Sequence, residues 1–239
     1  MLKYKNIVMD IRHKISAGTY AQGERLPTIP ELCDEYDVSK ITVKRAMDEL
    51  ESLGLIARRR GSGTYVKGLA GTSALTGARG MLGSYEDSLP DTRLLGERVS
   101  YEVHEFLVVQ PPSDIAKILD MDADAYAFYV CRTRFVDSVP DCVEHTYMPV
   151  SIAPHLNRSL MEGSLYRYAE DQLGLRVSSV HRAVGAVHPS TDEAKWLDVK
   201  PQSPLLSVRQ VDYLSDGTAF DVSTRTHAPG YEVFSVSTK

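Results

Sequence analysis

Apolar residues near the start of the chain recur at helical spacing. Ile7, Ile11 and Ile15 are four residues apart, which places them on one face of a helix. A second helix is expected to follow Thr28, because Thr28 and Glu31 occupy the two positions of a capping box. The pattern therefore predicts two consecutive amphipathic helices.

A third helix is predicted to begin after Ser39, which is a good N-cap residue, and to carry apolar residues at helical spacing as far as Leu50. Short strands at 55–57 and 64–66 flank a basic loop at 58–63. Two helices joined by a short turn and followed by a hairpin are typical of a winged helix-turn-helix, whose second helix enters a DNA groove.

After residue 80 the spacing changes to the alternation that is typical of strands. Strands are predicted at 98–109, 125–136, 142–148, 176–187, 205–214 and 218–226. Helices are predicted at 113–119, 163–173 and 190–198. Strands joined by short turns favour an antiparallel α+β domain, and the sequence has neither of the glycine patterns that mark nucleotide-binding loops.

A segment of small residues separates the two patterns. Residues 68–80, GLAGTSALTGARG, contain four glycines and show no periodicity, which indicates a flexible linker. We therefore assign 1–67 to a helix-turn-helix domain, 68–79 to a linker and 80–239 to a second domain.

The composition is that of an ordinary globular protein, with 43% apolar and 25% charged residues among 239. It contains no run of 18 apolar residues and no signal-peptide pattern, so we expect a cytoplasmic protein without a membrane partner. The three cysteines and seven histidines lack metal-site spacing, so neither a metal nor another cofactor is expected.

The net charge of −5 hides an asymmetry between the two domains. Residues 1–67 contain 12 basic and 9 acidic residues, a net charge of +3, whereas the remainder contains 15 and 23, a net charge of −8. A basic domain on an acidic body suggests that only the first domain meets a polyanion such as DNA.

The charges of the third predicted helix oppose the helix dipole. Lys40, Lys44 and Arg45 lie in its first half, whereas Asp48 and Glu49 lie in its second. This order should destabilise an isolated helix, so either it is an ordinary solvated face or the basic half is retained to bind phosphates. A helix-turn-helix setting favours phosphate contact.

The second domain has two polar patterns that suit a small ligand. Alternation places Arg132 and Arg134 on one strand face, roughly 7 Å apart, where they could bind an anion, face solvent or be neutralised by Glu144. Asp221, Ser223, Arg225 and His227 share a polar face of the last long strand, which could bind sugar hydroxyls or only water.

Residues 7–66 resemble the winged helix of the GntR family of bacterial regulators. The resemblance rests on GERLP at 23–27, VSKITVKRA at 38–46 and GSGTYV at 61–66. The sequence departs from the family at Thr28-Ile29, where Ser-Glu is usual, and at Lys40, where Arg is usual. The resemblance implies DNA contacts from Arg25, Thr28, Ser39, Lys40, Thr42, Lys44, Arg45, Arg60, Gly61, Ser62 and Gly63.

The second domain contains GSYED at 83–87, RTRF at 132–135, GSLY at 163–166, LG at 173–174, PLL at 204–206 and DVS at 221–223. On these marks residues 80–237 resemble the UTRA effector-binding domain of the HutC-type branch, whose fold is similar to chorismate lyase. In sugar-phosphate-sensing members, the positions that match Arg132, Arg134, Ser164 and Tyr166 bind phosphate, and those that match Glu144 and Asp221 bind hydroxyls. The implied effector-binding residues are Ser84, Tyr85, Arg132, Arg134, Glu144, Ser164, Tyr166, Asp221 and Ser223. A departure lies at 227–231, HAPGY, where an Arg-x-Asp-x-Tyr stretch is usual.

These features predict a transcriptional repressor that binds a palindromic operator as a homodimer and responds to a small anion such as a sugar phosphate. Two alternatives stay open. One is a chorismate-lyase-like enzyme with a DNA-binding head, although the sequence offers no nucleophile elbow and no catalytic residues are assigned. The other is a DNA-binding protein whose second domain only dimerises.

Overall fold

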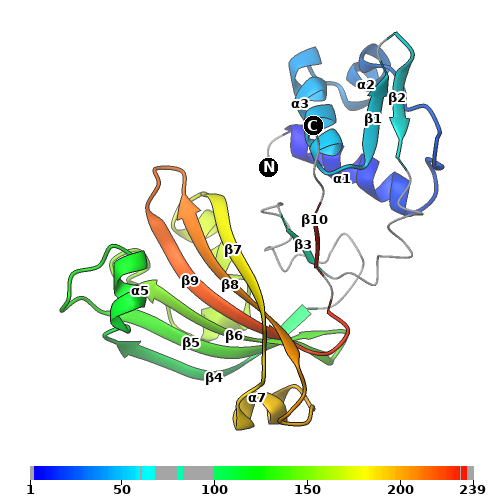
Figure 1. Cartoon of the computed structure of the whole chain (residues 1–239). Helices are drawn as coiled ribbons and strands as arrows, with labels where there is room; N and C mark the ends of the chain where they lie inside the picture. Colours follow the sequence, from blue (N-terminus) through cyan, green and yellow to red (C-terminus); the bar gives the residue numbers. More distant parts are fainter. Residues whose placement is uncertain (1–2, 60, 68–79, 83–98, 232, 236–239) are drawn as a thin grey trace. The chain divides into compact units, whose positions relative to one another are not determined.

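The computed structural model describes residues 3–59, 61–67, 80–82, 99–231 and 233–235. Its internal contacts divide the chain into two units, residues 1–84 with 232–239 and residues 85–231 (Figure 1). The predicted linker 68–79 lies outside the described residues.

The first unit contains three helices and two short antiparallel strands. These are α1 (Lys3–Ser16), α2 (Ile29–Tyr36), α3 (Lys40–Ser52), β1 (Ile56–Arg59) and β2 (Gly63–Val66). The helices enclose a core that includes Ile7, Ile11, Leu32, Met47 and Leu50, all nearly inaccessible to solvent. The predicted helical stripes therefore face one another. A further pair, β3 (Gly80–Leu82) and β10 (Val233–Ser235), is parallel.

Local capping interactions explain where α2 and α3 begin. Thr28 and Glu31 form the predicted capping box: the Thr28 N–H donates to the Glu31 carboxylate at 2.6 Å, and the Thr28 hydroxyl accepts the Glu31 N–H at 3.5 Å. Asp37 ends α2 in a left-handed conformation with φ 48°. The Ser39 hydroxyl then accepts the Thr42 N–H and starts α3, as predicted.

The wing differs from the prediction in one respect. Arg58 and Arg59 belong to β1 and pair with Thr64 and Gly63, so only part of the predicted loop 58–63 turns. Gly63 has φ 124°, and a Cβ there would lie 2.6 Å from Nε of Arg25. Only glycine suits this position, because a side chain would be strained and would displace Arg25.

The second unit is built on one antiparallel sheet with the strand order β4-β5-β6-β9-β8-β7. The strands are β4 (Val99–Val109), β5 (Ala127–Val136), β6 (Val139–Pro149), β7 (Val177–Val187), β8 (Leu205–Leu214) and β9 (Ala219–His227). All six were predicted within three residues at each end. Figure 1 shows a curved sheet, with α5 (Ser113–Ile118) and α7 (Thr191–Trp196) beside opposite ends of the strands.

The predicted helix 163–173 is present as α6 (Leu165–Arg167), which continues directly into a π-type turn η4 (Tyr168–Gln172). A separate 3₁₀ turn η3 (Arg158–Glu162) precedes it. Gly163 has an extended backbone and Ser164 is the N-cap, so the helix begins only at Leu165. The segment still buries Leu165 and Tyr166 against Phe128 and Phe220 of the sheet. In the described part of the chain, no helix combines the length and the apolar character needed to cross a membrane.

Candidate DNA interface and ligand pocket

The first half of α3 is an exposed basic surface. Lys40, Lys44 and Arg45 are all exposed, and Ile41 between them is 79% exposed. The hydroxyls of Ser39 and Thr42 lie 2.9 Å apart at the start of the helix. The opposite face of α3 is buried in the core. The predicted contact residues of this helix therefore share one accessible surface.

Two contacts organise the charges of α3. The guanidinium of Arg45 lies 4.2 Å from the centre of the Tyr4 ring, which orients it by a cation–π interaction. In the acidic half, Asp48 binds the guanidinium of Arg58 at 2.7 Å, and Glu51 lies 3.6 Å from it. The acidic residues thus pair with the first strand of the wing, a role that the helix pattern alone did not reveal.

The described part of the wing lies close to Arg25. A bridge pairs Arg25 with Tyr65, and the Arg25 side chain packs over Gly63. The Ser62 and Tyr65 hydroxyls lie 2.7 Å apart at the turn. Arg25, Gly61, Ser62 and Gly63 therefore gather at one end of the unit. Arg60 lies outside the described residues.

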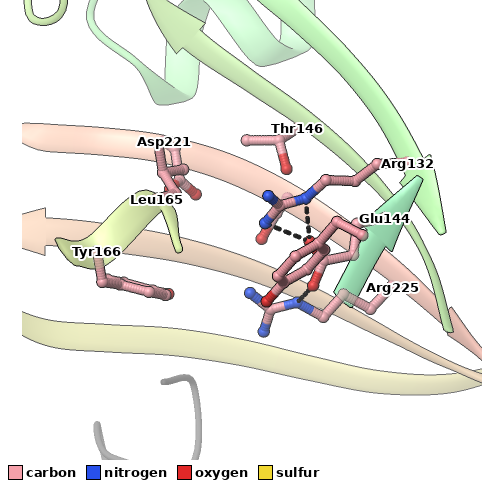
Figure 2. Close-up of a pocket in the computed structure, with 9 residues that line it drawn as sticks. Arg132, Glu144, Thr146, Leu165, Tyr166, Asp221 and Arg225 are labelled. Carbon is pink, nitrogen blue, oxygen red and sulfur yellow. Dashed lines mark hydrogen bonds and ion pairs between the residues drawn. The ribbon is translucent and has the colours of Figure 1, made fainter. Parts of the chain in front are cut away.

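A small polar pocket lies in the second unit between the sheet and α6. Figure 2 shows its lining: Tyr101, Arg132, Glu144, Thr146, Leu165, Tyr166, Asp221, Ser223 and Arg225. Arg132 comes from β5, Glu144 and Thr146 from β6, and the last three from β9. The pocket thus brings together five of the residues that the sequence assigned to effector binding.

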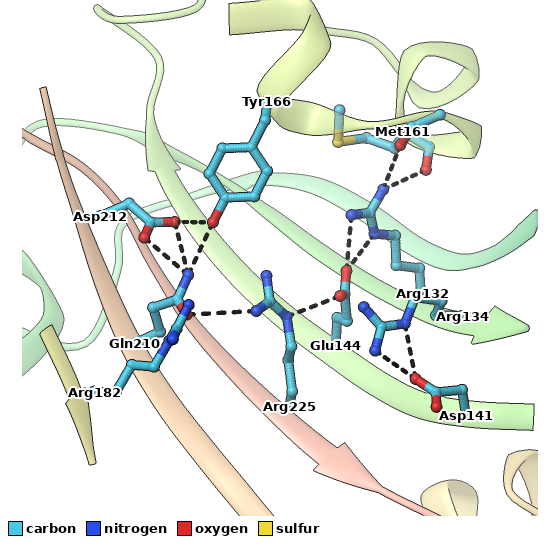
Figure 3. A network of polar contacts seen from close by, with 11 residues as sticks. Arg132, Arg134, Asp141, Glu144, Met161, Tyr166, Arg182, Gln210, Asp212 and Arg225 are labelled. Carbon is cyan, nitrogen blue, oxygen red and sulfur yellow. Dashed lines mark hydrogen bonds and ion pairs between the residues drawn. The ribbon is translucent and has the colours of Figure 1, made fainter. Parts of the chain in front are cut away.

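A buried arginine, Arg132, and a half-buried one, Arg225, share one carboxylate in this pocket. Arg132 donates from Nε and Nη2 to Oε2 of Glu144, at 2.8 and 2.7 Å. Arg225 donates from Nε to Oε1 of the same residue at 2.9 Å (Figure 3). Burial would raise the pKa of Glu144, but the charges of Arg132 and Arg225 outweigh it and hold that pKa well below its usual range. Glu144 is therefore ionised, and the group carries a net positive charge.

The pocket also contains polar atoms without partners. Oδ1 of Asp221, Oγ of Ser223 and the hydroxyl of Tyr101 are buried and make no hydrogen bond with any described residue. Asp212, which pairs with Asp221 across the sheet, binds Tyr166 and Gln210. Burial first, and then the Asp212 carboxylate, raise the pKa of Asp221 well above its usual value. A ligand that brings hydroxyl groups would satisfy these atoms.

Some predicted ligand residues lie outside this lining. Arg134 donates to Asp141, from Nε at 2.8 Å and from Nη2 at 2.5 Å, and is not among the pocket residues. The Ser164 hydroxyl accepts the Arg167 N–H at 3.3 Å and caps α6. Ser84 and Tyr85 lie outside the described residues.

The pocket includes four residues that the sequence did not assign to it, namely Tyr101, Thr146, Leu165 and Arg225. Arg225 carried a usable signal, because alternation from Asp221 and Ser223 places it on the same face. No such signal existed for Tyr101, because Tyr101 belongs to β4, whose register with β5 is set by long-range pairing.

Asp141, Cys142 and His227 form a buried cluster of the residue types that bind metals, with candidate atoms within 4.8 Å of one another. Arg134 already binds the Asp141 carboxylate, and its positive charge disfavours a cation there. We therefore assign no metal to this cluster.

Comparisons with known proteins match one family model to each of two parts of the chain. Residues 3–66 match the model of the bacterial regulatory proteins of the gntR family, and residues 94–230 match the UTRA domain. The second match covers more than half of the chain. This protein belongs to the GntR family. Its relatives are HutC-type transcriptional regulators, and the chain is itself a transcriptional regulator.

Individual relatives are similar to this chain over nearly its whole length. The chain is 30% identical over 227 residues to the transcriptional regulator GmuR of Bacillus subtilis, covering 95% of this chain and 94% of GmuR. It is 27% identical over 220 residues to the mannosyl-D-glycerate system repressor MngR of Escherichia coli, covering 92% and 89%. The crystal structure of YydK from B. subtilis superposes with a TM-score of 0.80 at 28% identity, covering both chains completely.

Proposed function

We propose that this GntR-family regulator is a repressor that binds a palindromic operator as a homodimer, and that a sugar phosphate or similar hydroxylated anion controls its affinity for DNA. The observation that carries this proposal is the pocket, where a positively charged group lies beside buried acceptors that lack donors. A phosphate would bind the arginines, and sugar hydroxyls would donate to Asp221 and Ser223.

The relatives support the same class of effector. MngR is named as a repressor of mannosyl-D-glycerate transport and metabolism, and other relatives are repressors named for fructoselysine utilisation. These names connect the family members with sugar-like compounds. We place the protein in the cytoplasm, where operator DNA is accessible. Repression of this kind requires no enzymatic step.

The DNA contacts we propose come from the exposed half of α3 and from the wing. Lys40, Thr42, Lys44 and Arg45 would lie along the major groove, with Ser39 and Thr28 close to phosphates at the helix starts. Arg25 and residues 60–63 would approach the adjacent backbone or minor groove.

A ligand panel followed by a DNA-binding assay tests this proposal. We expect one or more sugar phosphates to raise the melting temperature of the full chain, because a ligand that binds only the folded state stabilises it by mass action. The same compounds should change its affinity for its operator, whereas their unphosphorylated counterparts should do so only at much higher concentration.

The control is Ser223→Ala, which removes one unpartnered acceptor without changing the charge of the pocket. It should weaken the response to sugar phosphates and leave ligand-free DNA binding unchanged. If no compound in a broad panel shifted melting, the second unit would be a dimerisation domain only, and the proposal would be wrong.

A further inference from the structure

The arginine with hydrogen-bonding capacity left in the pocket is Arg225. A guanidinium has five N–H groups. Arg225 uses Nε for Glu144 and one Nη1 proton for Gln210 at 3.5 Å, so three N–H groups have no partner among the described residues. Figure 2 shows this guanidinium extending toward the ring of Tyr166.

The two arginines expected to bind phosphate have much less capacity left. Arg132 uses four of its five N–H groups, two on Glu144 and two on the carbonyl oxygens of Met161 and Gly163 at 2.7 and 2.9 Å. The Tyr101 ring lies 4.0 Å from the Arg132 guanidinium and covers it. Arg134 binds Asp141 away from the pocket.

The carboxylate of Glu144 occupies the position where a bound anion would interact most favourably with both guanidiniums. Its two oxygens lie between Arg132 and Arg225, and its side chain is only 4% exposed. A second anion that binds Arg225 must approach this carboxylate in a poorly solvated site, where like charges repel strongly. Glu144 therefore stabilises the empty pocket and opposes anion binding in the same place.

We infer that Arg225 is the principal anion-binding residue of this pocket and that Glu144 is a built-in counter-anion that weakens the binding of phosphate and so sets the threshold of the response. The inference rests on the proposed function, because it takes this pocket to be the effector site. A residue that only accepted hydrogen bonds from sugar hydroxyls would strengthen effector binding, whereas Glu144 is inferred to weaken the binding of the phosphate group.

Titration of inorganic phosphate into the full-length protein tests the inference. Glu144→Gln keeps the shape of the side chain and removes its charge, so we expect phosphate to bind at least tenfold more tightly than to the parent protein. Arg225→Gln should weaken phosphate binding at least tenfold. Isothermal titration calorimetry in a buffer without other oxyanions gives both affinities.

The matched control is Asp141→Asn, on the same strand as Glu144. It also converts a buried carboxylate beside an arginine into an amide, but Asp141 does not line the pocket. Phosphate affinity should stay within about twofold of the parent value. An equal gain in this variant would overturn the inference, because the effect would then be a general change of charge.

Other outcomes are equally decisive. Unchanged or weaker phosphate binding by Glu144→Gln would show that this carboxylate does not compete with the anion. Should that variant fail to fold, Arg225→Gln decides, since undiminished phosphate binding would overturn the inference. If sugar phosphates still controlled the operator affinity of the parent protein, only this inference would fail. If no phosphate compound bound any form, the proposed function would fail with it.

Discussion

His227 shows how burial changes the chemistry of a histidine. It is 1% exposed and stacks on Tyr231 with a distance of 3.4 Å between ring centres. Its Nδ1 has no hydrogen-bond partner among the described residues. Burial, together with the nearby charge of Arg134, lowers the pKa of His227 to about 3. The ring is therefore neutral in the folded protein at physiological pH.

This lowered pKa predicts a loss of stability in mild acid. The unfolded chain takes up a proton at His227 near pH 6.5 and the folded chain does not, so stability is present above pH 6.5 and falls as the pH is lowered toward 3. Between pH 6.5 and 5 the loss in the free energy of unfolding should be about 1.6 kcal/mol. Urea unfolding at these two pH values measures it, and His227→Gln should remove most of the difference. A variant with an unchanged pH slope would contradict the assigned neutral state.

At the scale of elements, α3 combines two surfaces with different partners. Its basic half is exposed, and its acidic half is paired with Arg58 of the wing. Residues that fail to complement the helix dipole should destabilise α3, and the ion pair with β1 offsets part of this effect. The reversed charge order is thus compatible with a stable domain and leaves the basic half available to phosphates.

We expect Arg45→Ala to weaken operator binding by about 1.5–3 kcal/mol, or roughly 10- to 100-fold, because a charge-assisted contact to phosphate is lost. The slope of log affinity against log salt should fall by about one unit. Lys14→Ala is the control, since Lys14 is already paired with Asp10 and Glu35 at 2.8 and 2.7 Å. Gel-shift titrations at several salt concentrations compare the two. Equal losses in both variants would mean that only net charge matters.

The elements were predictable where local interactions determine them. The capping box of Thr28 and Glu31, the cap at Ser39 and the six strands depend on residues close in sequence, so pattern and spacing revealed them. The pairing of Arg134 was not predictable in this way. A bulge in β6 adds Asp141 opposite Arg134 and Phe135, and this irregularity depends on the register of two strands. Long-range register likewise decides which side chains meet at the pocket.

At the scale of the whole molecule, the proposed function requires two chains on one operator. One helix-turn-helix reads one half-site, and a two-fold symmetric dimer places two such helices about one helical turn of DNA apart. The effector must then bind one arrangement of the dimer more tightly than another, since only differential affinity can shift the occupancy of DNA. The pocket and the DNA interface are in separate units, so the proposed function requires that ligand binding in one unit changes DNA binding by the other.

The spacing of the operator half-sites should therefore control affinity. We expect the protein to sediment as a dimer and to bind one palindromic duplex with two chains. Inserting about five base pairs between the half-sites turns them to opposite sides of the duplex and should weaken binding at least tenfold, because one dimer can no longer reach both without strain. Inserting about ten base pairs returns the half-sites to the same side of the duplex and should recover part of the affinity. Fluorescence anisotropy with the three duplexes measures these differences, and a duplex with one half-site provides the reference. Equal affinity for all four would show that each chain binds DNA independently.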